Sequence, residues 1–393
     1  MSRTLDAPIH QPFYQFTNEN WEPVNPDATT TTKAKPLHIL HLATWNIDYR
    51  APCPDKRMTK ALQYLSTLHN IFSNTTSNTT SNSSSTSPSI IFLQEMIPSD
   101  LDLIQQTPWI RIHFYITDIL HEERQQGSSW RVCPNWRSRY GTTALIDKRV
   151  GVRRVFRVLY STSKMGRDAL FVDVSINGNA NTNATTDIQS QDQMGEDGRH
   201  GIEEEEEEEE AGAETGKPET SILRLCNTHL ESFTSNPPIR PVQLRLASHF
   251  MRGRGPKHTG FVESREDPEL PIPHAAILAG DLNAFAPEDE TAPEECGLRD
   301  AFLELGGQEG SEEGFTWGQQ MAEYERGEFG CSRMDKVLFC GEVEVQSLEK
   351  IGSGEKFWIE YPEESDSEES SETGEDLWVT DHIGLQAVFR IVG

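Results

Sequence analysis

Short apolar runs recur along the chain between longer polar stretches, and they have the length of buried β-strands. A typical strand has roughly 5–6 residues. The runs that fit are residues 38–45, 89–94, 142–147, 169–176, 221–228, 275–280, 334–339 and 384–392. Helices are predicted at 57–72, 240–253 and, as a short one, 298–305. Many strands with few intervening helices predict an α/β fold in which two sheets pack together and helices lie outside them.

Four compositionally biased segments interrupt this pattern: residues 1–35, 73–88, 178–220 and 360–376. None of them can bury enough apolar surface to offset the conformational entropy that folding removes. We therefore expect a disordered N-terminal tail at 1–35. A single catalytic domain at 36–393, interrupted by three disordered inserts, is the simplest organisation.

The acidic charge of the chain is concentrated in two of these segments. Of the formal net charge of −28, residues 178–220 carry −12 and residues 360–376 carry −9, so that −7 remains for the rest. Such runs are typical of solvated, self-repelling inserts. The remainder is only mildly acidic, and the charge therefore does not exclude a nucleic-acid partner.

The chain has no run of about 18 apolar residues, so no membrane-spanning helix is predicted. Its first 35 residues lack the charged-then-apolar pattern of a signal peptide. Six scattered cysteines without CxxC pairing favour a reducing compartment. We expect a protein that stays inside the cell and does not bind membranes.

Polar residues collect at the ends of the predicted strands, where a rigid sheet can direct several side chains into one crevice. The segments are Thr44-Trp45-Asn46-Ile47-Asp48, Leu93-Gln94-Glu95, Asn227-Thr228-His229-Leu230-Glu231, Gly280-Asp281-Leu282-Asn283, Arg333-Met334-Asp335 and Thr380-Asp381-His382-Ile383-Gly384. Phosphoryl transfer needs a hard cation on oxygen ligands, a base for water and donors for the developing charge. These carboxylates, amides and imidazoles suit that chemistry. The absence of CxxC and HExxH spacings argues against a zinc site.

Each segment alone is more often structural than functional. A carboxylate after an apolar strand is usually part of a surface turn, and Gly-Asp-x-Asn is a common turn sequence. A single histidine after a strand usually has a structural role. Six such segments in order, each at a strand boundary, make coincidence improbable.

The ordered set resembles the endonuclease/exonuclease/phosphatase superfamily, through the pieces W-N-x-D, L-Q-E, T-H-L, G-D-x-N, R-x-D and D-H. The resemblance extends over about residues 38–390 without the inserts. It implies a four-layered, DNase I-like α/β sandwich and cleavage of phosphoesters with Mg²⁺, or with Mn²⁺ in its place.

Within that superfamily the chain is most similar to the 5′-tyrosyl-DNA phosphodiesterases. The similar segments are residues 44–48, 91–98, 161–168, 228–232, 296–298 and 315–317. Phe285 stands where that group usually carries an arginine. The resemblance implies that the partner is DNA with a 5′-tyrosyl adduct, that the enzyme is a monomer, and that it acts in DNA repair in the nucleus, with the cytoplasm as an alternative.

The resemblance also implies a role for each matching residue. Asp48 and Glu95 would bind the metal, and Asp381 would support the metal site. Asp281 would orient or deprotonate the attacking water. The phosphate would be held by Asn46, Asn283, His229 and His382, and Asp335 would steady His382. Arg167 would face the leaving tyrosine, while Arg240 and Trp317 would contact the substrate; the blander interpretation of Arg240 is a surface helix residue.

Other functions remain open from the sequence. The chain could be another phosphoesterase of the same superfamily, namely an abasic-site endonuclease, an RNA deadenylase or a lipid phosphatase. It could also be an inactive scaffold, or a histone-chaperone-like polyanion that works through Glu203 to Glu210. The intact set of polar residues favours an enzyme.

Overall fold

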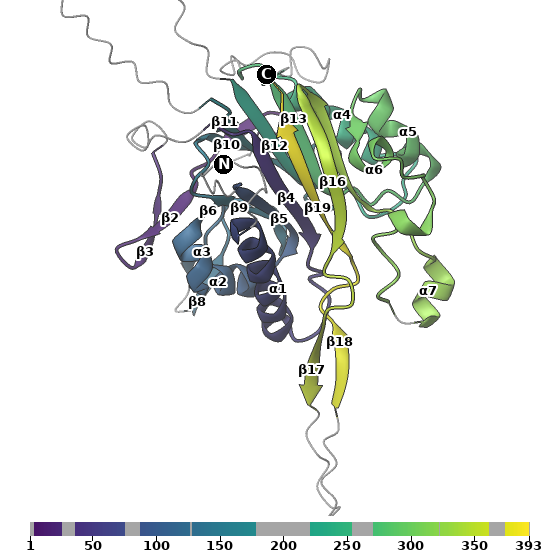
Figure 1. The fold of residues 1–393 in the computed structure, drawn as a ribbon. Helices are drawn as coiled ribbons and strands as arrows, with labels where there is room; N and C mark the ends of the chain where they lie inside the picture. The colour runs from purple at the N-terminus through teal and green to yellow at the C-terminus, as the bar shows by residue number, and fades with distance from the viewer. Residues whose placement is uncertain are drawn as a thin grey trace, which may run out of the picture.

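Two large sheets pack face to face in the computed structural model (Figure 1), which describes residues 4–25, 36–74, 87–125, 128–177, 221–253, 270–321, 323–360 and 374–392. In spatial order, the first sheet consists of β1 (Pro8–His10), β10 (Val152–Leu159), β11 (Asp168–Ser175), β12 (Ile222–His229), β13 (Ala275–Asp281), β15 (Asp335–Gly341) and β14 (Arg299–Asp300). The second consists of β16 (Val343–Ile351), β19 (Gly384–Ile391), β4 (Ile39–Asn46), β5 (Ser89–Met96), β9 (Gly141–Asp147), β6 (Phe114–Ile116), β2 (Tyr14–Thr17) and β3 (Asn20–Pro23).

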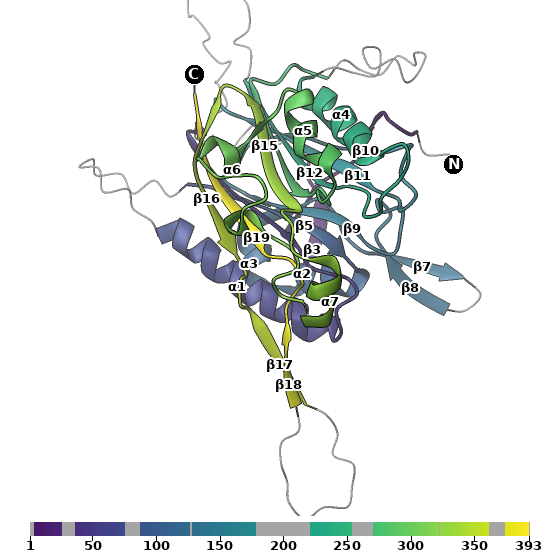
Figure 2. The same cartoon turned by 90° about the vertical axis from the view of Figure 1, so that its right-hand side faces the viewer.

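Helices cover the outer faces of both sheets, which gives four layers (Figures 1 and 2). They are α1 (Pro54–Asn74), α2 (Pro98–Gln106) and α3 (Pro108–His113) on the second sheet, and α4 (Arg240–Met251), α5 (Pro287–Glu295) and α6 (Ala301–Glu304) on the first; α7 (Glu323–Phe329) and a 3₁₀ turn at Glu312–Gly314 lie in a connecting loop. One apolar core separates the sheets, and a further core lies under each helical layer. The predicted α/β sandwich is confirmed.

All eight strands predicted from the apolar runs are present, and α1 and α4 confirm two of the predicted helices. The third predicted helix, 298–305, divides into the short strand β14 and the helix α6. The sequence pattern missed β10 because three arginines interrupt it, and one of them, Arg157, is buried against Asp118 and Asp168. It also missed β16, which has a half-exposed pattern at the sheet edge.

The prediction of a disordered tail at 1–35 is wrong for its central part. Strands β1, β2 and β3 lie there and extend both sheets at their edges. Phe13 is 2 % exposed and belongs to the core between the sheets. Pairing with the sheet edges, together with buried aromatic side chains such as Phe13, holds this polar segment in place.

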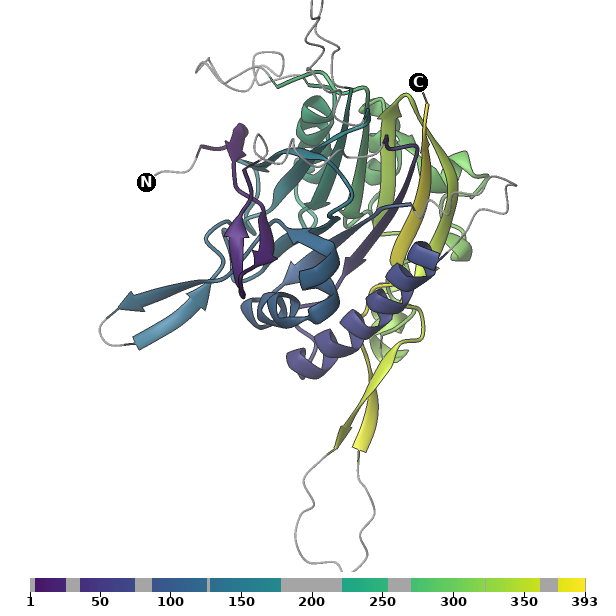
Figure 3. The same ribbon diagram turned by 60° about the vertical axis from the view of Figure 1, so that its left-hand side comes forward.

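The predicted inserts lie largely outside the described residues, namely at 75–86, 178–220 and 361–373. The stretch 374–376 is an exception, because it belongs to strand β18 (Gly374–Trp378). Strand β18 pairs with β17 (Lys356–Glu360), and β7 (His121–Gln125) pairs with β8 (Ser128–Val132); both hairpins project from the body of the sandwich (Figure 3). None of the described helices has the length and apolar character needed to cross a membrane.

Two parallel strand pairs position the candidate site. β4 runs parallel to β5, and β12 runs parallel to β13, so that each pair ends at the same edge of its sheet. In the second pair His229 lies directly opposite Asp281. Gly280 permits this approach: its φ is +150°, and a Cβ atom there would overlap the backbone oxygen of Thr228.

The Gly280→Ala variant should therefore be less stable than a glycine-to-alanine variant in which the added Cβ meets no other atom and only the positive φ causes strain. Gly306 is the matched control, because its φ is +92° and nothing lies within 4 Å of an added Cβ. We expect Gly280→Ala to lose about 1–3 kcal/mol more than Gly306→Ala, the usual cost of overpacking, in urea unfolding. Equal losses in the two variants would contradict this close contact.

Candidate active site

The residues that the motifs singled out meet at one end of the sandwich, where β4 and β5 of one sheet face β12 and β13 of the other. Asp281 is the centre of this group. Its Oδ2 accepts a hydrogen bond from Asn46 Nδ2 at 2.9 Å, and its Oδ1 accepts one from the backbone N–H of Asn283 at 2.8 Å. Two imidazoles flank the same carboxylate, with Nε2 of His229 at 3.2 Å and Nε2 of His382 at 3.7 Å.

The two histidines differ in charge. Nδ1 of His229 accepts from Arg167 at 2.6 Å, so its Nε2 carries the proton. Burial and the Arg167 charge lower the pKa of His229 to about 4. Nδ1 of His382 instead donates to Asp335 at 2.8 Å, and although burial opposes it, the Asp335 and Asp281 charges raise the pKa of His382 well above its usual range. One imidazole is therefore a neutral donor and the other a cation.

Asp281 itself is held ionised. Burial opposes ionisation, but the neighbouring charge of His382 and several hydrogen bonds keep the pKa of this carboxyl well below its usual range. Nε2 of His229 is buried and has no aligned hydrogen-bond partner among the described residues, although Asp281 is near. Because a buried donor without a partner is costly, this N–H suits a ligand oxygen.

Two further carboxylates lie at the ends of neighbouring strands: Asp48 follows β4, and Glu95 is the last residue but one of β5. Burial and the Asp381 charge raise the pKa of Asp48 to about 6. Burial raises the pKa of Glu95 to about 7, and Asp48 and Asp281 add to the rise while Arg167 opposes it. Clustered carboxylates that resist ionisation fit a bound cation, which would remove their mutual repulsion.

Both of these residues have left-handed backbones, with φ of +55° for Asp48 and +58° for Glu95. Local hydrogen bonds fix the turns: the Asp48 N–H donates to Asn46 Oδ1 at 2.9 Å, and the Tyr49 N–H donates to Glu95 Oε2 at 3.1 Å. Non-glycine residues in this region are strained and persist where the surroundings determine them, often at functional sites.

The tightest group of possible ligand atoms is not the predicted one. Asp281, Asp335 and His382 have ligand atoms within 4.8 Å of one another. Asp335 accepts a hydrogen bond from Nδ1 of His382 and orients the ring, whose Nε2 lies 3.7 Å from Asp281; we call this series of three residues the Asp281 relay. Asp48, Glu95 and Asp381 do not form so tight a group within the described part of the chain, and their role as metal ligands remains a prediction.

Trp317 lies beside this relay. Its indole Nε1 donates to Asp381 Oδ2 at 2.8 Å, and its backbone bridges to His382. Asp381 Oδ1 lies 3.9 Å from Nε2 of His382. Trp317 therefore orients a carboxylate of the site, and contact with a substrate remains a prediction.

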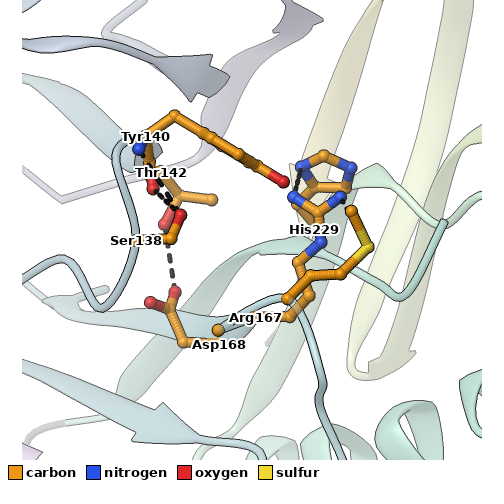
Figure 4. Close-up of a pocket in the computed structure, with 9 residues that line it drawn as sticks. Ser138, Tyr140, Thr142, Arg167, Asp168 and His229 are labelled. Carbon is orange, nitrogen blue, oxygen red and sulfur yellow. Dashed lines mark hydrogen bonds between the residues drawn. The ribbon is translucent and has the colours of Figure 1, made fainter. Parts of the chain in front are cut away.

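Arg167 lies in a small pocket beside His229, with Tyr140 on the opposite wall (Figure 4). Besides its bond to His229, the guanidinium donates to Ser232 Oγ at 2.6 Å, and its carbon lies 5.1 Å from the centre of the Tyr140 ring. Tyr140 in turn stacks on Tyr49 with ring centres 4.2 Å apart. This aromatic wall was not predicted from the sequence, because stacking depends on two loops that are remote along the chain.

The structure does not support the prediction that Arg240 contacts a substrate, nor that it is a surface residue. It is 4 % exposed, and its Nε and Nη2 donate three hydrogen bonds to the Asp289 carboxylate at 2.7–3.0 Å. One face of the Phe285 ring lies against the guanidinium, 4.2 Å from its carbon, and the ring is 40 % exposed. Arg240 therefore joins α4 to α5.

Sequence reasoning assigned no role to Gln94 and Asn227. Gln94 directly precedes Glu95, and Asn227 lies two positions before His229. Gln94 Nε2 donates to Asn227 Oδ1 at 2.8 Å, and Asn227 Nδ2 donates back across the core to the carbonyls of Leu93 and Thr143. Both side chains are fully buried between the sheets. Their polarity at apolar-facing strand positions was the available signal.

Loss of Arg240 should reduce stability rather than substrate affinity. In Arg240→Met the buried Asp289 carboxylate is left without its partner, which commonly costs about 3–5 kcal/mol in urea unfolding. Arg245→Met on the same helix is the control, because its ion pair with Glu295 is about half exposed and is worth roughly 1 kcal/mol or less. Equal stability of both variants, with a raised KM in Arg240→Met alone, would instead restore a substrate-binding role.

Comparison with known proteins adds one family match. The model of the Endonuclease/Exonuclease/phosphatase family matches residues 235–382, which include Asp281, Asn283, Asp335 and His382. No curated protein sequence matches the chain.

Several solved structures have similar folds at low sequence identity. Zebrafish TDP2 complexed with a single-strand DNA product is 17 % identical, with 90 % of this chain and 99 % of that chain covered and a TM-score of 0.49. TDP2 from C. elegans is 17 % identical, with 90 % and 75 % covered and a TM-score of 0.47. The human Nocturnin catalytic domain is 14 % identical, with 90 % and 94 % covered and a TM-score of 0.49.

The family model matches the segment that carries the Asp281 relay, and the remaining motifs lie at the same end of the sandwich. Such a set of buried amides, imidazoles and carboxylates is suited to cleavage of a phosphoester. The match confirms the resemblance to the endonuclease/exonuclease/phosphatase family that the motifs indicated, and together with the site it indicates a hydrolase of phosphoesters.

Proposed function

We propose that the protein is a Mg²⁺-dependent phosphodiesterase that hydrolyses 5′-phosphotyrosyl linkages in DNA. The observation that carries the proposal is the meeting, around Asp281, of Asn46, His229 and His382 from segments up to 336 positions apart. No packing requirement of the fold explains three polar side chains that converge on one buried carboxylate. A phosphate between them would find donors on several sides.

The cation would lie on Glu95 and Asp48, with support from Asp381. Burial, and to a lesser extent neighbouring carboxylates, raises the pKa of these first two carboxyls, and a bound divalent cation would favour their ionised forms. Oxygen ligands favour Mg²⁺ and also accept Mn²⁺. When bound, the ion would polarise the phosphoryl oxygens and reduce the charge on the developing transition state.

The remaining steps belong to side chains of the chain itself. Asp281 remains ionised, so it accepts a hydrogen bond from water and orients it toward phosphorus. The unpaired Nε2–H of His229 and the cationic His382 face the same space and stabilise the phosphoryl oxygens, as do the amides of Asn46 and Asn283. Asp335 holds the His382 ring in place through Nδ1.

The aromatic wall supports a tyrosyl leaving group. Arg167 presents a guanidinium beside His229, and the stacked Tyr140 and Tyr49 continue the wall next to Glu95. A phenolic ring of the substrate fits such a surface, through cation–π contact and offset stacking. The partner is then DNA with a 5′-tyrosyl adduct, and a nuclear role in DNA repair follows from that substrate. We further propose a monomer with one catalytic domain, which comprises strands β1–β3 as well as residues 36–393.

The central test is turnover of a 5′-phosphotyrosyl oligonucleotide with Mg²⁺. Asp281→Asn and Glu95→Gln should each lose about 10²–10³-fold in kcat, the usual cost of removing one such group. Glu290→Gln, an exposed carboxylate on α5, is the control and should retain full activity.

The same preparations are assayed on abasic-site DNA, polyadenylated RNA and a phosphoinositide. If the wild type turns over one of these substrates faster than the tyrosyl oligonucleotide, that substrate would be assigned to the enzyme instead. Full activity of Asp281→Asn or Glu95→Gln would reject the assigned site.

Arg167 should matter more for an aromatic leaving group than for an aliphatic one. Arg167→Met removes a cation–π contact of about 0.5–2 kcal/mol, so the preference for a tyrosyl over an alkyl 5′-phosphodiester should fall by about 2- to 30-fold. Arg167→Lys retains the charge, so its preference for the tyrosyl substrate should lie between those of the wild type and Arg167→Met. If both substrates slow by the same factor, Arg167 acts only through His229.

A further inference from the structure

We infer that Arg57, together with Asp100, is a positioning residue that holds the two proposed metal-ligand turns, at Asp48 and at Glu95, in fixed relation to each other. The inference rests on the proposed function, since it concerns the cation site of that reaction. The hydrogen bonds of Arg57 and Asp100 reach backbone groups and each other, not the side chains of Asp48 or Glu95. Both residues lie behind the site, at the starts of α1 and α2, and both are 0 % exposed.

Arg57 fixes the first turn. From the first helical turn of α1, its Nη1 donates to the carbonyl oxygen of Ile47 at 2.6 Å and also to that of Asp48. These carbonyls flank the left-handed backbone of Asp48, whose φ is +55°. The guanidinium thereby satisfies two carbonyls that leave the ladder of β4 and stabilises the turn that directs the Asp48 side chain.

Asp100 fixes the second turn. Its Oδ2 accepts the N–H of Ile97 at 3.1 Å, which caps α2 two residues after Glu95. The Glu95 backbone is also left-handed, with φ of +58°. A helix cap of this kind sets the direction in which the chain leaves β5 and therefore the placement of the Glu95 side chain.

The ion pair between the two residues joins the turns. Nη2 of Arg57 donates to both oxygens of Asp100 at 3.1 Å. A third contact joins the two turns directly, because the Tyr49 N–H donates to Glu95 Oε2 at 3.1 Å. The two ligand turns come from strands β4 and β5, which are neighbours, but the strand ladder ends before either carboxylate.

The alternative is that the Arg57–Asp100 ion pair only stabilises the fold. The chain contains a similar buried ion pair that can serve as a control. Arg224 and Asp173 are also buried, and Arg224 donates two bonds to the carboxylate, at 2.6 and 2.8 Å, and further bonds to the carbonyls of Phe250 and Pro271. This pair lies near the start of β12, five positions before His229, and holds no turn of the site. Its loss should affect stability alone.

The test compares Arg57→Met with Arg224→Met. Isothermal titration calorimetry measures Mg²⁺ binding without substrate, and thermal unfolding measures stability. Both variants should unfold at lower temperature. Only Arg57→Met should bind Mg²⁺ more weakly, by about 10- to 100-fold, the range typical of groups that orient metal ligands. Its activity should recover at high Mg²⁺ concentration, because the ligands themselves are intact.

The outcomes separate the two proposals. If the wild type binds Mg²⁺ and Arg57→Met binds it equally well, or if Arg224→Met weakens binding as much, the positioning role is overturned while the proposed function stands. If the wild type binds no Mg²⁺, the proposed function fails and this inference fails with it.

A milder pair of variants covers the case in which Arg57→Met does not fold. Asp100→Asn and Asp173→Asn each remove one buried charge and keep the shape of the side chain. Asp100→Asn should weaken Mg²⁺ binding more than Asp173→Asn does at a similar loss of thermal stability. Equal Mg²⁺ affinities in these two variants would overturn the positioning role.

Discussion

The hydrogen bond between Gln94 and Asn227 joins the two sheets within a largely apolar core. It lies directly behind the site, because Gln94 precedes Glu95 and Asn227 precedes His229 by two positions. A slip of either sheet would leave two buried amides without partners, which is costly in an apolar core. The bridge therefore fixes the register of one half of the site against the other. Every distance between Asp281 and the groups of the opposite sheet depends on it.

Within that frame the charges of the site balance only in part. His382 and Arg167 carry buried positive charge. This charge offsets only part of the negative charge of Asp281, Asp335, Asp48 and Glu95. The two kinds of group lie side by side, since Glu95 Oε1 is 3.7 Å from Nε2 of His229. Such a site offers donors for a phosphate and carboxylates for a cation next to each other.

Much of this was accessible from the sequence, because strand periodicity and strand-end polarity are local properties. Eight strands and the grouping of Asn46, Glu95, His229, Asp281 and His382 followed from them. The rest depended on contacts between remote segments. Arg240 is a charged residue of a type usually exposed on helices, yet Asp289 from another helix makes its burial favourable. Strands β1–β3 became ordered only because the sheets offered edges to pair with.

The order in which the chain is made sets a constraint on this fold. Strand β19 lies between β16 and β4, and His382 directly precedes it, 336 positions after Asn46. At about 5–20 residues per second, a ribosome would need roughly 15–70 s to supply the second after the first. During that time one edge of the apolar strand β4 is unpaired, and such edges promote aggregation. The yield of folded protein should therefore depend on translation speed and on factors that shield nascent strands.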